Sequence, residues 1–265
     1  MRTDIPFPNG DLPALLKYPV NLIEQMPACL ILHGFVSCKE GDNGMHNLIA
    51  NMLNELGMVT LQFDFCSCGE NANHKSNYTV NQMMEEAIYV YEYLCSLDSV
   101  DGNNVLVIGH SFGCRVTSSI LDRINPRGII TLNGALGDKY RIPCWFKSEM
   151  DRIQKECRTL GKSEFIDSLG NKQEIYQKFL VELEQSDAVS LIKKYNNQLL
   201  VIYGSDDPTV DPNVSIKFYE SASTTNKKLV CIEGANHTFN IKTNDWTKMY
   251  ECIEVIRKWL VDYYL

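Results

Sequence analysis

The stretch Val105-Leu-Val-Ile-Gly-His-Ser-Phe-Gly-Cys-Arg-Val-Thr-Ser-Ser-Ile-Leu-Asp122 decides the fold of this chain. Its first four residues are apolar and mostly β-branched, which predicts a buried strand, and from Phe112 onward apolar residues recur at helical spacing. The turn between them is Gly109-His110-Ser111-Phe112-Gly113. A serine between two glycines at a strand-to-helix turn is typical of a nucleophile elbow, because the glycines make room for a sharp turn that exposes the hydroxyl. The alternative is a glycine-rich turn with an incidental serine.

Strands and helices alternate along the rest of the chain. Asn9-Gly10 between two extended stretches predicts a hairpin near the N-terminus. The alternation predicts an α/β fold: a mostly parallel central sheet with helices on both faces and a functional site at the carboxyl ends of the strands. By apolar periodicity we expect further strands at 28–32, 59–65, 128–133, 198–203 and 228–232, and helices at 45–56, 78–97 and 245–263.

One interval is too long for a simple crossover between neighbouring strands. Roughly 64 residues separate the strands expected at 128–133 and 198–203, whereas a crossover with one helix needs about 20 to 30. The excess predicts an inserted cap subdomain at 135–186. The core of the fold would then consist of two segments, 1–134 and 187–265.

The expected cap contains two stretches with helical spacing, 147–160 and 172–184. A cap that leaves the sheet beside the strand ends would overhang Ser111 and supply apolar walls for a substrate. The alternative is an insertion that only adds stability or forms the contact of a homodimer. The candidates for the substrate pocket are the aromatic residues Trp145, Phe146 and Phe179.

The composition excludes several classes of partner. The chain has 265 residues, 45% of them hydrophobic and 22% charged, as expected for a globular protein. A net charge of −8 without a cluster of Lys or Arg argues against nucleic acid or an anionic membrane as the main partner. Residues 1–6 lack the apolar core of a signal peptide, and no apolar run approaches the ~18 residues of a membrane span. We therefore expect a cytoplasmic protein.

Ten cysteines are present, but none forms the C-x-x-C pairs of a zinc site, and the chain is too large for a small disulfide scaffold. Free thiols in a reducing compartment are the expectation. Cys66-Ser67-Cys68 as a metal or redox site is the alternative.

A serine nucleophile requires a base within hydrogen-bond reach and an acid that orients the base. Among the five histidines, His237 follows the last expected strand, at the same edge of the sheet as Ser111, and is the candidate base. His110 adjoins the serine in sequence and cannot turn its ring onto that hydroxyl, while His33 belongs to the turn after an earlier strand. The remaining two are expected to be solvated: His46 at a helix start and His74 in a polar loop.

The acid should follow another strand end, and Asp206 and Asp207 both do. A tetrahedral intermediate formed on the serine needs two N–H donors aimed at its oxyanion, and losing one typically costs about 2.7–4 kcal/mol. We expect one donor to be the backbone N–H of Phe112, directly after the serine. The other is expected from Phe35, in the turn His33-Gly34-Phe35. This chemistry requires no metal and no cofactor.

Four motifs in this order resemble those of serine hydrolases of the α/β-hydrolase fold: His-Gly-Phe at 33–35, Gly-His-Ser-Phe-Gly at 109–113, Gly-Ser-Asp-Asp-Pro-Thr-Val at 204–210 and Gly-Ala-Asn-His-Thr-Phe at 234–239. They span nearly the whole chain. With a cap after the sixth strand, the chain is most similar to the cinnamoyl/feruloyl-esterase-like branch, which neighbours monoglyceride lipases and serine aminopeptidase-like hydrolases.

The resemblance implies a carboxylesterase for small to medium esters, aromatic acyl esters among them, with the triad Ser111, Asp207 and His237. The spacing Gly204-x-x-Asp207-x-x-Val210 matches the acid loop of this family, so Asp207 is favoured and Asp206 becomes a turn residue. The implied partner is a small-molecule ester. The alternatives are a thioesterase, a lysophospholipase or monoacylglycerol lipase, an aminopeptidase with cap carboxylates in its pocket, and a non-catalytic ligand-binding protein. The aminopeptidase candidates are Glu149, Asp151 and Glu156.

Overall fold

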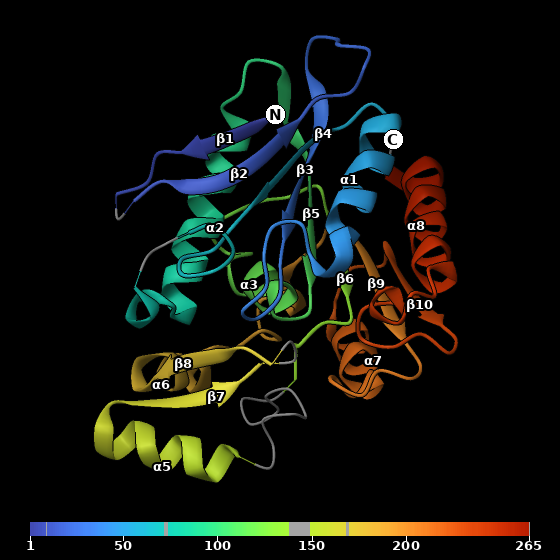
Figure 1. The fold of residues 1–265 in the computed structure, drawn as a ribbon. Helices are drawn as coiled ribbons and strands as arrows, with labels where there is room; N and C mark the ends of the chain where they lie inside the picture. Colours follow the sequence, from blue (N-terminus) through green and yellow to red (C-terminus); the bar gives the residue numbers. More distant parts are fainter. Residues whose placement is uncertain (9, 72–73, 138–148, 168–169, 265) are drawn as a thin grey trace.

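The computed structural model describes residues 1–8, 10–71, 74–137, 149–167 and 170–264. The described residues form an eight-stranded sheet with helices on both faces, together with a smaller group of elements beyond one end of the sheet (Figure 1). The predicted α/β fold with a mostly parallel central sheet is therefore confirmed.

The strands of the main sheet are β1 (Arg2–Ile5), β2 (Leu12–Lys17), β3 (Met26–Leu32), β4 (Val59–Phe63), β5 (Val100–His110), β6 (Gly128–Leu132), β9 (Gln198–Gly204) and β10 (Lys227–Ile232). The helices against the sheet are α1 (Met45–Glu55), α2 (Val80–Cys95), α3 (Phe112–Ser119), α7 (Pro212–Ser221) and α8 (Thr247–Trp259), the last continued by the π-helical turn Leu260–Tyr264. Short 3-10 turns lie at Asp42–Gly44, Lys75–Asn77, Ile192–Lys194 and Ile241–Thr243.

The order of the strands across the sheet is β1-β2-β4-β3-β5-β6-β9-β10. The pairs β1–β2 and β2–β4 are antiparallel, and the other neighbouring pairs are parallel. The hairpin predicted near the N-terminus forms between β1 and β2, with Ile5 opposite Leu12. β5 lies between β3 and β6. The turn after β5 therefore lies in the middle of the row of turns at the carboxyl ends of the parallel strands.

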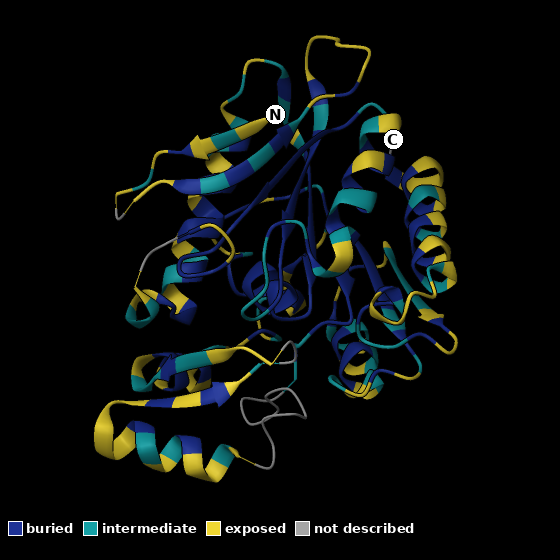
Figure 2. Ribbon diagram, viewed as in Figure 1, coloured by how far each residue is buried: buried dark blue, intermediate teal, exposed yellow. Residues whose placement is uncertain are grey.

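Successive residues of the central strands point to opposite faces of the sheet. In β5, Val105 and Val107 join the core formed with α2 and α3, whereas Leu106 and Ile108 join the core formed with α1 and α8. Each such side chain stabilises the fold by about 1.5–3 kcal/mol when fully buried. Figure 2 shows the result, with the central strands buried and the outer surfaces of the helices exposed.

Between β6 and β9 the chain leaves the main sheet. The described residues there form α5 (Met150–Leu160), a two-stranded antiparallel hairpin of β7 (Lys162–Ile166) and β8 (Lys172–Tyr176), and α6 (Gln177–Gln185). Figure 1 shows these elements together at one end of the molecule, with both termini at the other end. Their buried side chains belong to the same apolar core as α2, so this segment is packed onto the sheet domain.

The prediction of one helix over 172–184 is wrong for residues 172–176. Residues Lys172–Tyr176 are a strand, and the helix begins only at Gln177. Ile175 is buried as a strand residue opposite Ser163 of β7, so pairing with a neighbouring strand outweighed the helical spacing of the apolar residues. The other expected cap helix is present as α5 from Met150, and residues 147–148 lie outside the described part of the chain.

Candidate active site

Ser111 stands on a strained turn between β5 and α3. Its backbone has φ 54° and ψ −117°, a region that costs a non-glycine residue about 1–3 kcal/mol. A Cβ on Gly109 would lie 2.6 Å from the backbone N of Cys114, and one on Gly113 would lie 2.2 Å from the carbonyl O of Leu32. Only glycine fits at either position, which is why this sharp turn requires both glycines.

Ser111, His237 and Asp207 follow three different strands, and their side chains form one hydrogen-bonded chain. Nε2 of His237 lies 2.9 Å from Oγ of Ser111, and Nδ1 of His237 lies 2.7 Å from Oδ2 of Asp207. Because an ionised carboxylate only accepts, Nδ1 is the donor, which leaves Nε2 free to accept the serine proton. The structure thus brings together the three residues predicted as nucleophile, base and acid.

The Asp207 carboxylate is held by its own turn. Its Oδ1 accepts hydrogen bonds from the N–H groups of Thr209, at 2.7 Å, and Val210, at 3.0 Å, and its side chain is 2% exposed. The Asp206 carboxylate is exposed and accepts from the Ser205 hydroxyl. Asp207 is therefore the aspartate beside His237, and Asp206 is a turn residue.

Three further histidines, His33, His46 and His110, lie buried near the triad. Burial, reinforced by the neighbouring ring of His237, lowers the pKa of His110 to about 4. Burial also lowers the pKa of His46 and of His33. The His110 ring lies 5.2 Å from the His237 ring and 5.7 Å from the His46 ring, measured between centroids.

The expectation that His46 is solvated is wrong. His46 is fully buried, although it is the second residue of α1, and its Nδ1 lies 3.2 Å from the carbonyl O of Lys39. The loop before α1 folds over the start of that helix, a long-range effect that helical periodicity cannot reveal. His74 is exposed as expected, and its ring accepts a hydrogen bond from the N–H of Ser76.

The backbone segments predicted to bind an oxyanion both border Ser111. Phe112 is the first residue of α3, so its N–H belongs to the N-terminal turn of that helix. Phe35 follows Gly34, where an added Cβ would lie 3.1 Å from Cβ of Ser111. The Phe35 and Phe112 rings are 6.0 Å apart between centroids.

A buried ion pair, which the sequence pattern did not indicate, lies in the same loop after β3 as Phe35. Nζ of Lys39 lies 2.7 Å from Oδ2 of Asp64, and the Lys39 backbone N–H donates to Oδ1 at 2.7 Å. Oδ2 also accepts from the N–H of Glu70 at 2.9 Å. This single carboxylate thereby joins the loop after β3 to the loop after β4.

Two adjoining cavities give access to the triad. The smaller, of about 230 Å³, is lined by Ser111 and His237 among others. The larger, of about 660 Å³, extends to the connection of the hairpin β7–β8, where it is lined by Asp167 and Asn171. The passage to Ser111 therefore runs between the loop after β3 and the β7–β8 hairpin. The two cavities share four lining residues: Phe35, Ser37, Asp42 and Lys242.

Phe179 of α6, one of the three pocket candidates, lies in an aromatic cluster next to these cavities. It is 2% exposed, its ring stacks on Tyr78 at 5.5 Å, and it lies 5.4 Å from Phe35 and 5.7 Å from Phe112. Phe179 therefore backs the Phe35 ring, which itself lines both cavities. The other two candidates, Trp145 and Phe146, lie outside the described residues.

The cysteines of the described part of the chain are free thiols. Burial raises the pKa of Cys66 to about 11 and raises that of Cys68 further above its usual range. Because the thiolate is the form that binds metals and exchanges disulfides, burial works against the metal or redox alternative. Among the described residues, no three His, Cys, Asp or Glu side chains are grouped as metal ligands would be.

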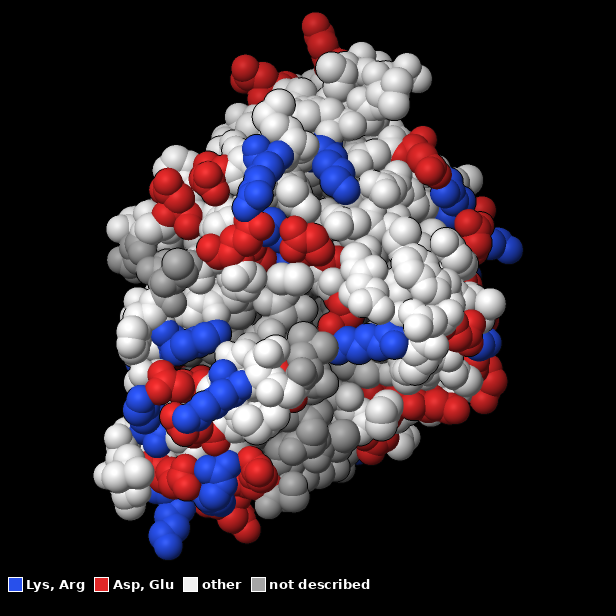
Figure 3. All heavy atoms as spheres, viewed as in Figure 1, with Lys and Arg blue, Asp and Glu red and all other residues white. Residues whose placement is uncertain are grey.

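Acidic and basic side chains are mixed over the face seen in Figure 3, most densely on the part formed by α5, β7 and β8. On that part, Arg152 pairs with Glu149 and Glu156, each at 2.8 Å, and Lys172 pairs with Glu164 at 2.7 Å. Within the described ranges, no helix combines the length and the apolar character that crossing a bilayer requires.

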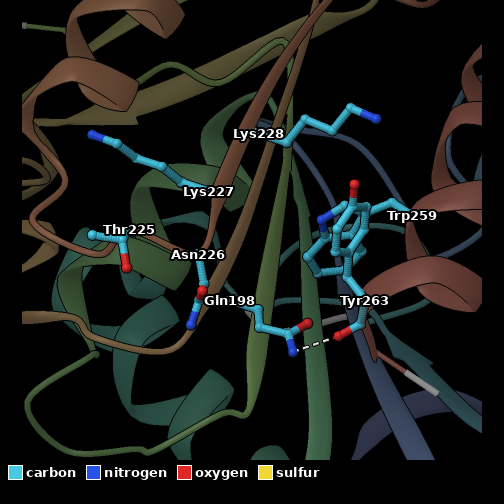
Figure 4. Close-up of a pocket in the computed structure, with 7 residues that line it drawn as sticks. All are labelled: Gln198, Thr225, Asn226, Lys227, Lys228, Trp259 and Tyr263. Carbon is cyan, nitrogen blue, oxygen red and sulfur yellow. Dashed lines mark hydrogen bonds between the residues drawn. The ribbon is translucent and has the colours of Figure 1, made fainter.

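A separate cavity of about 480 Å³ lies at the amino-terminal ends of β9 and β10, and Figure 4 shows the residues that line it. Its residues include Gln198 and Lys227, the first residues of β9 and β10, and Tyr263 of the C-terminal π-helical turn. A seven-residue strand spans about 20 Å, so this cavity is a strand length away from the turns that carry Asp207 and His237. It is not part of the triad site.

Comparisons with solved structures agree with this architecture. The structure of Est1E from Butyrivibrio proteoclasticus with bound ferulic acid is 22% identical with a TM-score of 0.76, and the match covers 98% of each chain. An esterase domain from a Rhodothermus marinus protein is 20% identical, with a TM-score of 0.71 and complete coverage of both chains. A monoacylglycerol lipase from Paleococcus ferrophilus is 17% identical, with a TM-score of 0.69 over 95% of this chain and 98% of the lipase. No protein-family model and no curated protein sequence matches the chain.

These structures share the arrangement described above along almost the full length of the chain. Matches at about 20% sequence identity establish the fold, whereas the chemistry depends on the residues at the site. The central, mostly parallel sheet and the serine turn at the end of β5 fit the same architecture. The chain has the α/β-hydrolase fold.

Proposed function

We propose that this protein is a serine carboxylesterase that hydrolyses small to medium carboxylic esters, aromatic acyl esters among them, through an acyl-enzyme on Ser111. One observation carries the proposal: Ser111, His237 and Asp207 form a continuous hydrogen-bonded chain of 2.9 and 2.7 Å that ends at a cavity of about 230 Å³. The solved esterases and lipase of the same fold support ester hydrolysis as the reaction class.

In the first half of the reaction, Ser111 Oγ attacks the ester carbonyl carbon while His237 Nε2 takes the hydroxyl proton. Asp207 stabilises the imidazolium that forms and keeps Nδ1 as its donor. The negative charge on the former carbonyl oxygen is bound by the N–H groups of Phe35 and Phe112. As the tetrahedral intermediate collapses, the C–O bond to the alcohol breaks and His237 returns its proton to the leaving oxygen.

In the second half, a water molecule takes the place of the alcohol. His237 removes a proton from the water as its oxygen attacks the acyl carbon, and the same two N–H groups bind the second oxyanion. Collapse of this intermediate breaks the bond to Ser111 Oγ, which regains its proton from His237. The carboxylic acid leaves, and the reaction consumes only the ester and one water.

We further propose that residues 135–186 form a cap over this site, with 1–134 and 187–265 as the core. The β7–β8 hairpin supplies one wall of the larger cavity, and the aromatic ring of Phe179 backs that of Phe35 beside the nucleophile. An apolar ring surface at this place suits an aromatic or short aliphatic acyl group. The ferulic acid bound by the Butyrivibrio esterase is a ligand of this kind.

The three carboxylates named as aminopeptidase candidates do not favour that activity. Glu149 and Glu156, two of the candidates to hold a substrate ammonium group, both pair with Arg152, which also donates to the Glu164 carbonyl of β7. Neither lines the cavities beside Ser111. Thioesters and monoacylglycerols are the competing substrate classes, because their hydrolysis uses the same triad chemistry. The solved monoacylglycerol lipase of the same fold supports the second of these alternatives.

A substrate panel with two variants tests the proposal. Wild-type protein is assayed with p-nitrophenyl esters of increasing acyl length, methyl esters of aromatic acids, acyl thioesters, a monoacylglycerol and amino-acid anilides. We expect the highest kcat/KM on the short and aromatic esters, and Ser111→Ala should abolish turnover. Ser96→Ala, an exposed serine at the end of α2, should behave as wild type.

Labelling by a fluorophosphonate probe separates catalysis from mere binding. Such a probe forms a covalent bond only with an activated serine, so we expect labelling of the wild type and none of Ser111→Ala or His237→Ala. A folded wild-type protein that binds small molecules tightly but resists the probe and hydrolyses no ester would be a ligand-binding protein, contrary to the proposal.

A further inference from the structure

We propose that Asn133 is a positioning residue for the triad: its side-chain amide ties the loop that carries His237 to the strand that leads to Asp207. The inference rests on the proposed function, since it concerns the same site. It comes from three hydrogen bonds that converge on one buried side chain directly after β6.

The Asn133 amide uses its acceptor and its donors in different directions. Oδ1 accepts from the backbone N–H of Gly204, the last residue of β9, at 2.8 Å. Nδ2 donates to the carbonyl oxygens of His237, at 2.9 Å, and Asn236, at 3.2 Å. Gly204 precedes Asp207 by three residues, so one planar group connects the acid turn with the backbone of the base itself.

The backbone around Asn133 completes the connection to the nucleophile. The N–H of Ser111 donates to the carbonyl of Leu132 at 2.9 Å, and the N–H of Ala135 donates to the carbonyl of Ser111 at 3.0 Å. The N–H of Asn133 donates to the carbonyl of Ile202 in β9 at 3.0 Å. The short segment 132–135 therefore contacts the serine turn directly, while the Asn133 side chain contacts the other two.

An asparagine suits this position for two physical reasons. The backbone has a φ of 46°, a left-handed conformation that asparagine adopts more readily than most residues. The side chain is 1% exposed, and a short amide is the group that offers one acceptor and two donors in such a space. A carboxylate of the same shape would place an oxygen against two carbonyl oxygens.

His110 is a second donor to the same carbonyl, since its Nε2 lies 3.1 Å from the carbonyl O of His237. Loss of the Asn133 amide therefore leaves one of two anchors on the His237 backbone. We expect a partial loss of rate rather than the near-complete loss that follows removal of a triad residue. A misplacement of about 1 Å in a catalytic group can cost about 100-fold in rate.

The test uses Asn133→Ala, which removes all three hydrogen bonds, and Asn133→Asp, which keeps the acceptor for Gly204 and removes the donor. For both we expect kcat on a short p-nitrophenyl ester to fall about 10- to 100-fold, with KM within about threefold of wild type. The matched control is Thr131→Val, two residues earlier in β6. Thr131 is 1% exposed, and its hydroxyl makes no hydrogen bond within the described residues, so kcat and KM should not change.

A spectroscopic readout separates positioning from a general loss of structure. In proton NMR of wild type, we expect a low-field resonance from the proton shared by His237 Nδ1 and Asp207. This resonance should be broadened or lost in both Asn133 variants and retained in Thr131→Val. It does not depend on turnover, so it remains readable if the protein hydrolyses no ester and the proposed function fails.

Several outcomes overturn the proposal. One is a kcat and a low-field resonance equal to wild type in folded Asn133 variants. Another is a loss of activity that matches a loss of folded protein, measured by circular dichroism and by titration of active sites. A failure of both variants to fold would also overturn it, because Asn133 would then be required for the fold rather than for positioning.

Discussion

Lys39 and Asp64 form an ion pair of 2.7 Å between Nζ and Oδ2 in which the two residues are only 2% and 0% exposed. Removing two charges from water is costly, and such a pair persists because further hydrogen bonds satisfy the carboxylate. Here the backbone N–H groups of Lys39 and Glu70 do so. The pair joins the loops after β3 and β4, and its expected effect is on the stability of the Phe35 turn.

Lys39→Met should destabilise the protein by about 3–5 kcal/mol, because it leaves the Asp64 carboxylate buried without its counterion. The free energy of unfolding in urea measures this. Arg257→Met breaks an ion pair with Glu55 of the same 2.7 Å length whose side chains are 32% and 65% exposed, and it should cost no more than about 1 kcal/mol. Equal effects of the two substitutions would contradict the special role of burial.

Asp207→Asn should lower kcat by about 10⁴-fold with little effect on folding, because the amide no longer fixes the His237 tautomer that accepts the serine proton. Asp206→Asn is the matched control on the neighbouring residue, and its kcat should stay within about threefold of wild type. Steady-state kinetics on a short p-nitrophenyl ester measures both. If the larger loss were found with Asp206→Asn, the assignment of the acid would be wrong.

Glu86 makes stability fall as the pH rises. It is 1% exposed, and burial raises the pKa of its carboxyl from 4.5 to about 7 despite hydrogen bonds from the Cys66 N–H and from Gln82. Because the folded state holds this proton more tightly, the stabilisation is complete below about pH 4.5 and is lost as the pH rises through about 7. The loss amounts to about 3 kcal/mol.

Glu86→Gln should remove this part of the pH dependence, as measured by urea unfolding at intervals between pH 4.5 and pH 8. Glu85→Gln changes the exposed neighbour on α2 and should keep the wild-type slope. A wild-type slope in Glu86→Gln would show that another group is responsible.

His110 makes the stability of the folded protein fall as the pH decreases. Its pKa is lowered from 6.5 to about 4, so its contribution to stability is present above about pH 6.5 and is lost as the pH falls through about 4. His110→Gln keeps a donor for the His237 carbonyl but does not titrate. Between pH 7 and pH 4, we expect this variant to lose less free energy of unfolding than wild type. The exposed control His74→Gln should behave as wild type. If His110→Gln lost as much free energy of unfolding as wild type, His110 would not be the group responsible.

Phe179→Ala should loosen the packing of the proposed cap and weaken binding of aromatic acyl esters. Replacing a buried Phe by Ala typically costs about 3–5 kcal/mol, and this ring contacts both Tyr78 of the core and Phe35 beside the nucleophile. We expect faster proteolytic cleavage within 135–186 and a higher KM for aromatic esters. Val181→Ala, on the same helix but 41% exposed, should change neither.

The parts of the site that sequence predicted are those with strict local geometry. The strained turn at Ser111 tolerates only glycine at 109 and 113, so its chemistry is visible in five consecutive residues. The turn at Asp207 is also visible in a short stretch of sequence, because its carboxylate accepts hydrogen bonds from N–H groups two and three residues later. The α/β fold followed from apolar runs that are buried on both faces of the sheet.

The parts that sequence missed depend on partners far away in the chain. Asn133 hydrogen-bonds residues 71 to 104 positions later, and nothing in its own neighbourhood signals this. Helical periodicity places His46 at the start of a surface helix, but it gives no sign of the loop that buries this residue. Ile175 kept helical spacing with Phe179 while pairing as a strand residue with Ser163. In each case tertiary contacts outweighed local preference.

The strand order also bears on when the protein acquires its reactivity. During synthesis, the serine at the end of β5 leaves the ribosome long before the residues that follow β9 and β10. Until those late strands add to the edge of the sheet, the hydroxyl has neither base nor counter-charge and is an ordinary alcohol. Under the proposed mechanism, the nascent polypeptide therefore does not react with esters, and it becomes reactive only with the last stages of folding.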